Sequence, residues 1–476
     1  MKCDESKPNC LRCIKFKIDC GGYDTTNGTK AEQKAAKGPP RPIPILPSSA
    51  RRGQALFLQP LGGILFQSNL EARYFVHFRE HVVPELTGPF SSSLWSQIML
   101  QACQSESCVL EATVALAALR MSLSTIQEST TSLGSSEILA QHYHFALQQY
   151  GKAIRNMRKA LASSNTRSNN RKALICCLLI FCFEAFQGNH SIATLHAKSG
   201  CRLLQNWLAA NSSTTSHAEG ISFAGHTAIE DDLVRAFNRL ELQIMTYTDS
   251  SPLEGHKFAS KHGGSIVADM PEIFSDFDEA NRYWELVMWR NHHFIHSAIA
   301  PATGNTDIHS SMSAASKIDL RAGIGSLIRS FYNSDRFPIL QTEHSLYSTE
   351  ISRWQSAFKP FLSPTNGHIH GGAAILQMHS ISTQITLDLL LTGKDTLNRH
   401  ADKFQNILYL ARSGILGLGQ ESFNMDLGII PSLYVILGNC HDLVLQHEVR
   451  QILASTIRRE GVWNSLDVQI KAVSLD

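Results

Sequence analysis

Residues 70–83 read LEARYFVHFREHVV, and their pattern indicates the fold class. Their apolar side chains recur at spacings of three and four residues, at Leu70, Tyr74, Phe75, Phe78 and Val82. This spacing places them on one face of an α-helix, whereas a half-buried strand would alternate at every second residue. The stretch therefore predicts an amphipathic helix, and it marks where the chain turns helical.

The same periodicity continues towards the carboxyl terminus. Ser91 to Ser93 precede LWSQIMLQACQ (94–104), which is typical of a capped helix start. Alternating strands and an internal repeat are absent, which argues against a solenoid. The expected fold class is all-α, a large irregular helical domain over 69–476. Its further helices are expected at 108–123, 138–162, 171–187, 192–210, 227–246, 278–299, 319–332, 371–393, 397–413 and 443–457.

The longest apolar run is ALICCLLIFCF, residues 173–183. A bilayer-spanning helix needs roughly 20 apolar residues, so the run predicts a central buried helix and no membrane partner. Free cysteine packs as a small apolar side chain. The same burial is therefore expected for seven scattered cysteines: Cys103, Cys108, Cys176, Cys177, Cys182, Cys201 and Cys440.

Charge is distributed unevenly along the 476 residues. Residues 1–52 carry eleven Lys or Arg against five Asp or Glu, although the whole chain has a net charge of only +2. A basic segment at one end suits contact with nucleic acid. Residues 24–68, which include GPPRPIPILPSS at 38–49, predict a disordered linker without the apolar heptads of a coiled coil. No secretory signal opens the sequence, so an intracellular protein with reduced thiols is expected.

Residues 1–23 hold the chemistry-bearing motif, C-x6-C-x2-C-x6-C. Four thiolates at such short separations can surround zinc as a tetrahedron, in a segment too short for an apolar core. The expected metal ligands are Cys3, Cys10, Cys13 and Cys20.

KCDESKPNCLRCIKFKIDCGGY (2–23) resembles the second half of the fungal Zn₂Cys₆ binuclear cluster. The resemblance aligns the four cysteines with the family's third to sixth, Lys2 with the lysine before the third, and Pro8 with the loop proline. In that family six thiolates hold two zinc ions, and the half carrying the first C-x2-C also carries the base-reading helix. Four thiolates could instead rearrange around a single zinc.

The family's first C-x2-C would lie upstream of Met1. A misassigned start is the favoured explanation, and a genuine short form without DNA recognition is the alternative. Lys2 then remains from the base-contact set. Arg12, Lys15 and Lys17 either contact phosphates or form a solvated face, with equal weight.

The resemblance extends to the body at residues 70–120, 144–161 and 429–465, which are similar to the fungal-specific transcription factor regulatory domain. The last stretch includes Pro431, Tyr434 and the run from Arg458 to Trp463. The resemblance implies a domain that regulates the head, sometimes through partners or small ligands.

Enzyme motifs are absent from the sequence, so no enzyme is expected. His292 and His296 have a metal-compatible spacing without an acidic partner, His368 and His370 lie in a predicted loop, and His142 and His144 point to different helix faces.

The combined prediction is a nuclear, zinc-dependent, sequence-specific DNA-binding regulator of transcription by RNA polymerase II. Its expected partners are double-stranded DNA, through the complete head, and transcriptional co-regulators. No sequence feature supports a small-molecule effector. The alternative is a helical protein-interaction regulator that does not bind DNA.

Overall fold

The computed structural model describes residues 66–90, 92–128, 133–162, 166–212, 228–248, 252–299, 337–364, 369–392, 400–415, 421–455 and 457–468. The chain divides into two units, residues 1–61 and 62–476. All described residues belong to the second unit. The predicted zinc head, the linker up to residue 65 and the helix expected at 319–332 lie outside the described residues.

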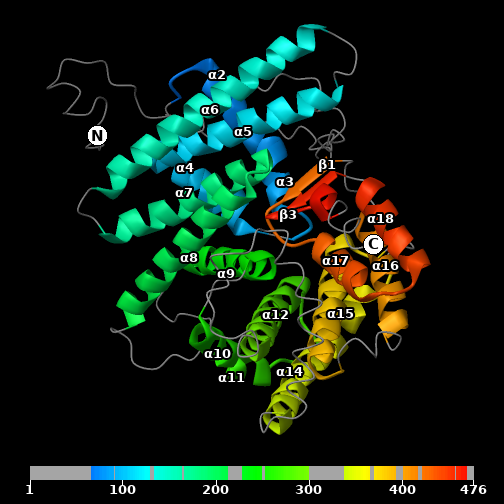
Figure 1. The fold of residues 1–476 in the computed structure, drawn as a ribbon. Helices are drawn as coiled ribbons and strands as arrows, with labels where there is room; N and C mark the ends of the chain where they lie inside the picture. The colour runs from blue at the N-terminus through cyan, green and yellow to red at the C-terminus, as the bar shows by residue number, and fades with distance from the viewer. Residues whose placement is uncertain are drawn as a thin grey trace, which may run out of the picture. The chain divides into compact units, whose positions relative to one another are not determined.

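The described unit is built almost entirely of helices, which confirms the all-α prediction (Figure 1). Its helices before the first strand are α2 (Asn69–His77), η2 (Phe78–Val82), α3 (Val83–Thr87), η3 (Leu94–Ile98), α4 (Met99–Ser105), α5 (Ser107–Glu128), α6 (Leu133–Leu161), α7 (Thr166–Gln187), α8 (His190–Ser212), α9 (Ala228–Thr248), α10 (Leu253–Lys261), α11 (Gly264–Ala268), α12 (Phe277–Ile299), α14 (Phe337–Phe358), η6 (Lys359–Leu362), α15 (Gly371–Thr392) and α16 (Ala401–Ile415). Two helices follow it, α17 (Ile430–Asn439) and α18 (Leu443–Ser455). Within the described residues, none of these helices combines the length and apolarity needed to cross a membrane.

The expected helices that fall within the described residues are present, and most run a few residues longer than the pattern indicated. α10, α11, α14 and α17 were not anticipated. The helix start near residue 94 is correct, but the expected serine cap is wrong. Ser93 makes no side-chain cap bond, and its hydroxyl donates instead to the carboxylate of Asp232 on α9. The Ser93 hydroxyl therefore bonds a carboxylate that is distant in the sequence and does not bond the backbone N–H groups of its own helix.

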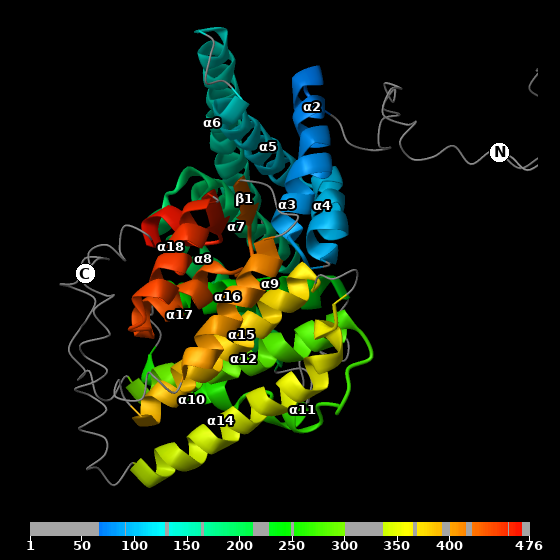
Figure 2. The same ribbon diagram turned by 90° about the vertical axis from the view of Figure 1, so that its right-hand side faces the viewer.

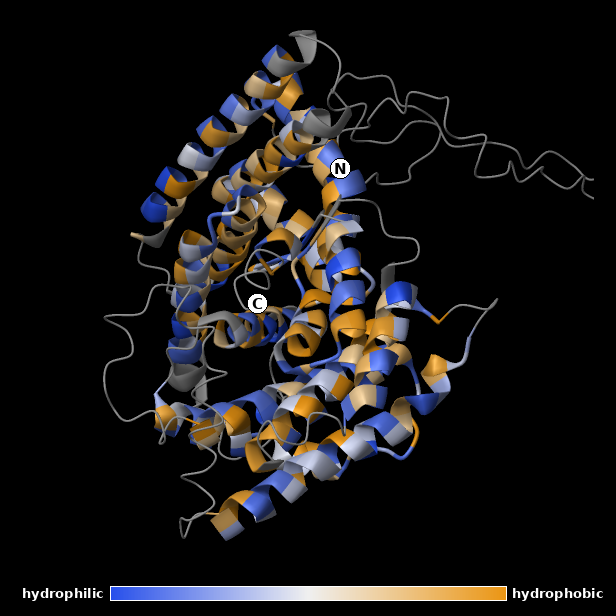
Figure 3. Ribbon diagram, turned by 45° about the vertical axis from the view of Figure 1, so that its right-hand side comes forward, coloured by the Kyte–Doolittle hydropathy of each residue, from blue (hydrophilic) through white to orange (hydrophobic). Residues whose placement is uncertain are grey.

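Helix α7 lies at the centre of the amino-terminal helices, as its composition predicted. Every residue from 173 to 186 is buried except Cys177, which is half-buried. α7 contacts α5, α6 and α8, and α5 packs beside α6 along its length (Figures 1 and 2). A helix apolar on all sides is stable only when neighbours cover every face. Most of the surrounding helices show an apolar side and a polar side (Figure 3).

A small sheet corrects the expectation that strands are absent. β1 (Glu421–Asn424) pairs in parallel with β2 (Ile457–Glu460), which pairs antiparallel with β3 (Trp463–Asn464). The helix expected to reach residue 457 ends at Ser455. Strands of two and four residues are too short for an alternating pattern to be recognised.

The sheet joins the carboxyl-terminal elements to helices far away in the sequence. The carboxylate of Glu85 on α3 accepts from the backbone N–H of Phe423 at 2.9 Å. The ring of Phe423 stacks on Phe186 of α7, with centroids 3.9 Å apart. Gln243 on α9 donates from Nε2 to the carbonyl of Met425 at 2.5 Å. The sheet therefore fixes α3, α7 and α9 to the last part of the described chain.

Candidate functional site

The predicted zinc ligands Cys3, Cys10, Cys13 and Cys20 lie outside the described residues, as do Lys2, Arg12, Lys15 and Lys17. Whether these residues suit zinc is therefore judged from the chemistry of the four cysteine thiols. Four thiols within eighteen residues supply soft anionic ligands in the number that tetrahedral zinc takes. The donor set fits zinc, and the assignment of these residues stays a prediction.

The seven cysteines of the body are free, as predicted. Five are buried, and Cys177 and Cys201 are half-buried. Burial raises the pKa of Cys177 to about 11 and that of Cys103 to about 12. A thiol that stays protonated binds metal poorly and reacts slowly. These two behave as packing side chains.

The histidines singled out in the sequence form no metal site in the described structure. Burial, together with the neighbouring His296 and His379, lowers the pKa of His292 to about 3, so its ring is neutral at physiological pH. Nδ1 of His142 bonds the hydroxyl of Tyr74 at 2.6 Å. His370 rests edge-on against Phe277, and His368 is outside the described residues. Among the described side chains, no group of three or more His, Cys, Asp or Glu could hold a metal.

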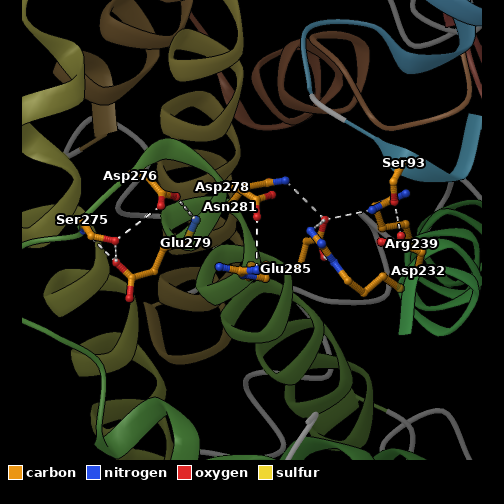
Figure 4. A network of polar contacts seen from close by, with 11 residues as sticks. Ser93, Asp232, Arg239, Ser275, Asp276, Asp278, Glu279, Asn281 and Glu285 are labelled. Atoms are coloured by element: carbon orange, nitrogen blue, oxygen red, sulfur yellow. Dashed lines mark hydrogen bonds and ion pairs between the residues drawn. The ribbon is translucent and has the colours of Figure 1, made fainter. Parts of the chain in front are cut away.

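Four charged residues inside the body form what we call the Arg–carboxylate bridge: Arg235 and Arg239 of α9, Glu285 of α12, and Asp426 just after β1. Arg235 donates from Nε and Nη2 to the two carboxylate oxygens of Glu285, at 3.0 and 3.3 Å. Arg239 donates from Nη1 to Glu285 at 3.0 Å and from Nε to Asp426 at 2.8 Å. Figure 4 shows Arg239 and Glu285 within this polar network, with Ser93 and Asp232 beside Arg239. The bridge connects three separate parts of the chain.

The charges of the bridge are balanced, and the pKa values follow from their placement. Burial raises the pKa of Glu285, but Arg239 and Arg235 outweigh it and hold that pKa below its ordinary value. Asp426 bonds one arginine, so burial prevails and its pKa is raised. Two half-buried cations against two carboxylates leave the site with no strong preference for an anion or a cation.

A cavity of about 50 Å³ lies beside the bridge. Its lining combines Arg239, Glu285 and Asp426 with apolar side chains such as Phe90, Leu242, Trp284, Met288 and Leu427. No described acceptor pairs with the buried Nε1 of Trp284. An apolar cavity of roughly 150 Å³ accommodates benzene, whereas one water needs about 10–15 Å³. The cavity as described suits a few waters, and it does not support a small-molecule effector.

No motif or spacing in the sequence indicates the Arg–carboxylate bridge as a unit. Arg235 and Arg239, four residues apart in a mostly apolar helix, were the available signal, since such a pair predicts acidic partners on one face. Nothing in the sequence around Asp426 identifies it as one of those partners, because the pair is 187 residues apart.

Two family models match the chain, and neither reaches the stretch at 429–465. Residues 1–30 match the fungal Zn(2)-Cys(6) binuclear cluster domain, and residues 73–249 match the fungal specific transcription factor domain. The first match confirms the resemblance of the cysteine head and implies zinc as the cofactor. No solved structure matches the chain significantly.

Two curated relatives are similar to parts of the chain. The aspercryptin biosynthesis cluster-specific transcription regulator atnN of Emericella nidulans is 27% identical over 261 residues, which cover 53% of this chain and 39% of that protein. The transcription regulator lscL of Purpureocillium lilacinum is 22% identical over 210 residues, covering 44% of this chain and 47% of that protein. The matched regions span less than half the length of either relative.

Proposed function

We propose that this chain, which carries the zinc cluster domain and the regulatory domain of the fungal zinc-cluster transcription regulators, is a zinc-dependent DNA-binding regulator of transcription by RNA polymerase II. The observation that carries the proposal is the match of residues 1–30 to the cluster domain, because that segment includes all four closely spaced cysteines. Both curated relatives are named as transcription regulators, which supports the same assignment.

The roles proposed for the cysteine head and the helical body follow from the chemistry of each. Zinc bound by the thiolates of Cys3, Cys10, Cys13 and Cys20 would order a segment that has no apolar core of its own. Arg12, Lys15 and Lys17 would then present their charges to phosphates, which position a protein on DNA without reading its sequence. Lys2 is the residue proposed to reach a base edge.

The helical body is proposed to regulate the head through co-regulators, without an enzymatic step, in the nucleus. Support comes from the family match over 73–249. A helical interaction protein without DNA binding is the competing proposal, and the head decides between the two.

The test uses Cys10→Ala, with Cys182→Ala as the matched control. Cys10 is a proposed ligand, whereas Cys182 is fully buried in α7. The Cys10 variant should lose bound zinc, measured by mass spectrometry of the metal, together with binding to duplex DNA. The control should retain both. A zinc-free Cys10 variant that binds DNA like the unaltered chain would refute the proposal.

Salt dependence separates the two proposals further. Three phosphate contacts predict a slope of about −2.7 in log affinity against log salt, which is a loss of about 40-fold between 50 and 200 mM. Replacing Arg12, Lys15 and Lys17 together by Ala should flatten that slope. If the zinc-loaded chain does not bind duplex DNA at 50 mM salt, the result would favour the helical interaction protein.

A further inference from the structure

Two cysteine sulfurs lie in contact where α5 packs on α7. The thiol of Cys176 donates to Sγ of Cys108, and the two sulfurs are 3.7 Å apart. Each residue is 2% exposed. The pair joins positions 68 residues apart in the sequence. A disulfide has an S–S distance of about 2.05 Å, so the two sulfurs need to approach by roughly 1.7 Å to form one.

The surroundings distinguish the two thiols chemically. Cys108 is the second residue of α5, where the free backbone N–H groups of a 22-residue helix favour a negative charge. The hydrogen bond from Cys176 lowers the pKa of Cys108, and the same bond raises the pKa of Cys176 together with burial. Cys108 is therefore the better nucleophile and Cys176 the resolving thiol.

The pair lies just below the surface. Ser105 and Ser107, on either side of the break between α4 and α5, are exposed. Lys172 and Glu106, whose charges act on Cys108, form an ion pair of 2.6 Å whose side chains are 14% and 25% exposed. Cys108 directly follows the exposed Ser107, whereas Cys182, further along α7, is fully buried.

We propose that Cys108 and Cys176 form an intramolecular redox site that a hydroperoxide converts to a disulfide. The Cys108 thiolate attacks the distal peroxide oxygen, the O–O bond breaks, and water or an alcohol leaves with the proton. The resulting sulfenic acid is attacked by Cys176 sulfur, the S–O bond breaks, and water leaves. The sum is two thiols and one hydroperoxide giving one disulfide, one alcohol or water, and one further water.

Formation of the Cys108–Cys176 disulfide would change the packing in the core of the body, and it does not depend on DNA binding. Val109 and Ala112 of α5 and Ile175 and Leu179 of α7 are buried around the pair. The two sulfurs must approach each other to form the bond. Close-packed helices respond by shifting as units, because a close-packed core has few voids into which single side chains could move. Oxidation therefore changes the packing of α5 on α7 without a ligand.

The experiment treats the reduced full chain with hydrogen peroxide, unfolds it, alkylates the remaining thiols and sequences the peptides by mass spectrometry. We expect one linked species, Cys108 to Cys176, which dithiothreitol reverses. In Cys176→Ser the reaction should stop at a sulfenic acid on Cys108 that dimedone traps. Cys182→Ser is the matched control, and it should form the same link as the unaltered chain.

The unaltered chain alone can overturn the proposal, so the test does not depend on the folding of a variant. Circular dichroism before and after peroxide shows whether the helices persist. Full alkylation of both Cys108 and Cys176 after treatment of the folded chain would refute the redox site. A link that forms only after the helical signal is lost would refute it as well.

Discussion

Glu460 is a buried carboxylate whose partners are mainly backbone N–H groups. Its two oxygens accept from Gly428, Ile429 and Ile430 at 3.1, 2.9 and 2.8 Å. These groups open α17, where a helix has no internal acceptors and favours a negative charge. Arg458, 4% exposed, lies 3.9 Å from the same carboxylate. A residue of β2 thus caps a helix that begins thirty residues earlier.

Replacing Glu460 by Gln should destabilise the body by about 1–3 kcal/mol, because an amide turns an N–H group towards donors that need an acceptor. Urea unfolding followed by circular dichroism measures the loss. Glu448→Gln is the matched control. Glu448 pairs with Arg412 at the surface, and such an exposed pair contributes about 1 kcal/mol or less. Equal costs for the two variants would contradict the capping role.

At the scale of elements, the end of α3 depends on its contact with β1. Gly88 terminates α3 with φ +58° and ψ −144°, a conformation that is open essentially to glycine alone. A Cβ at this position would lie 2.7 Å from Nδ2 of Asn424. The turn after α3 is therefore constrained both by its backbone and by the strand that packs against it.

Gly88→Ala should cost more stability than Gly188→Ala. Gly188 also has a positive φ, +81°, but no atom lies within 4 Å of the Cβ that alanine would add. The control variant bears only the backbone strain, about 1–2 kcal/mol, whereas Gly88→Ala adds the clash with Asn424. Thermal unfolding of both variants measures the difference. Similar midpoints would show that α3 and β1 are not closely packed at this point.

At the scale of the whole described unit, the Arg–carboxylate bridge links α9, α12 and the segment after β1. The side chains of Arg235, Arg239 and Glu285 are 17–19% exposed, and removing one partner of such a half-buried ion pair leaves the other charge without its compensation. Glu285 is the centre of the bridge because it accepts from both arginines. Its loss would leave Arg235 without the carboxylate that it contacts here.

Glu285 should make the stability of the body sensitive to acid. Its folded pKa is held below the unfolded value, so the stabilisation is complete above about pH 4.3 and is lost as pH falls towards the folded pKa. Glu285→Gln should therefore flatten the fall in unfolding free energy below that pH. Glu254→Gln, at an exposed carboxylate, is the control. If the unfolding free energy of Glu285→Gln falls below that pH as steeply as that of the unaltered chain, Glu285 is not the source of the acid sensitivity.

The helical class and the position of the core could be predicted from the sequence. Periods of three and four residues report which side of a helix is apolar, and the all-apolar run at 173–183 requires a central position wherever it packs. The cysteine head was likewise identifiable, because four ligands close together in the sequence reach a metal without help from the fold.

The contacts between residues that are distant in the sequence became visible in the three-dimensional fold alone. The partners Arg239 and Asp426, Cys108 and Cys176, and Glu460 and the first turn of α17 are separated by 30 to 187 residues. No local pattern encodes such a pairing, since a charged or thiol side chain looks the same in sequence whether its partner is solvent or a buried group. The short strands could not be predicted from the sequence for the same reason, because they form where distant backbone segments are brought together.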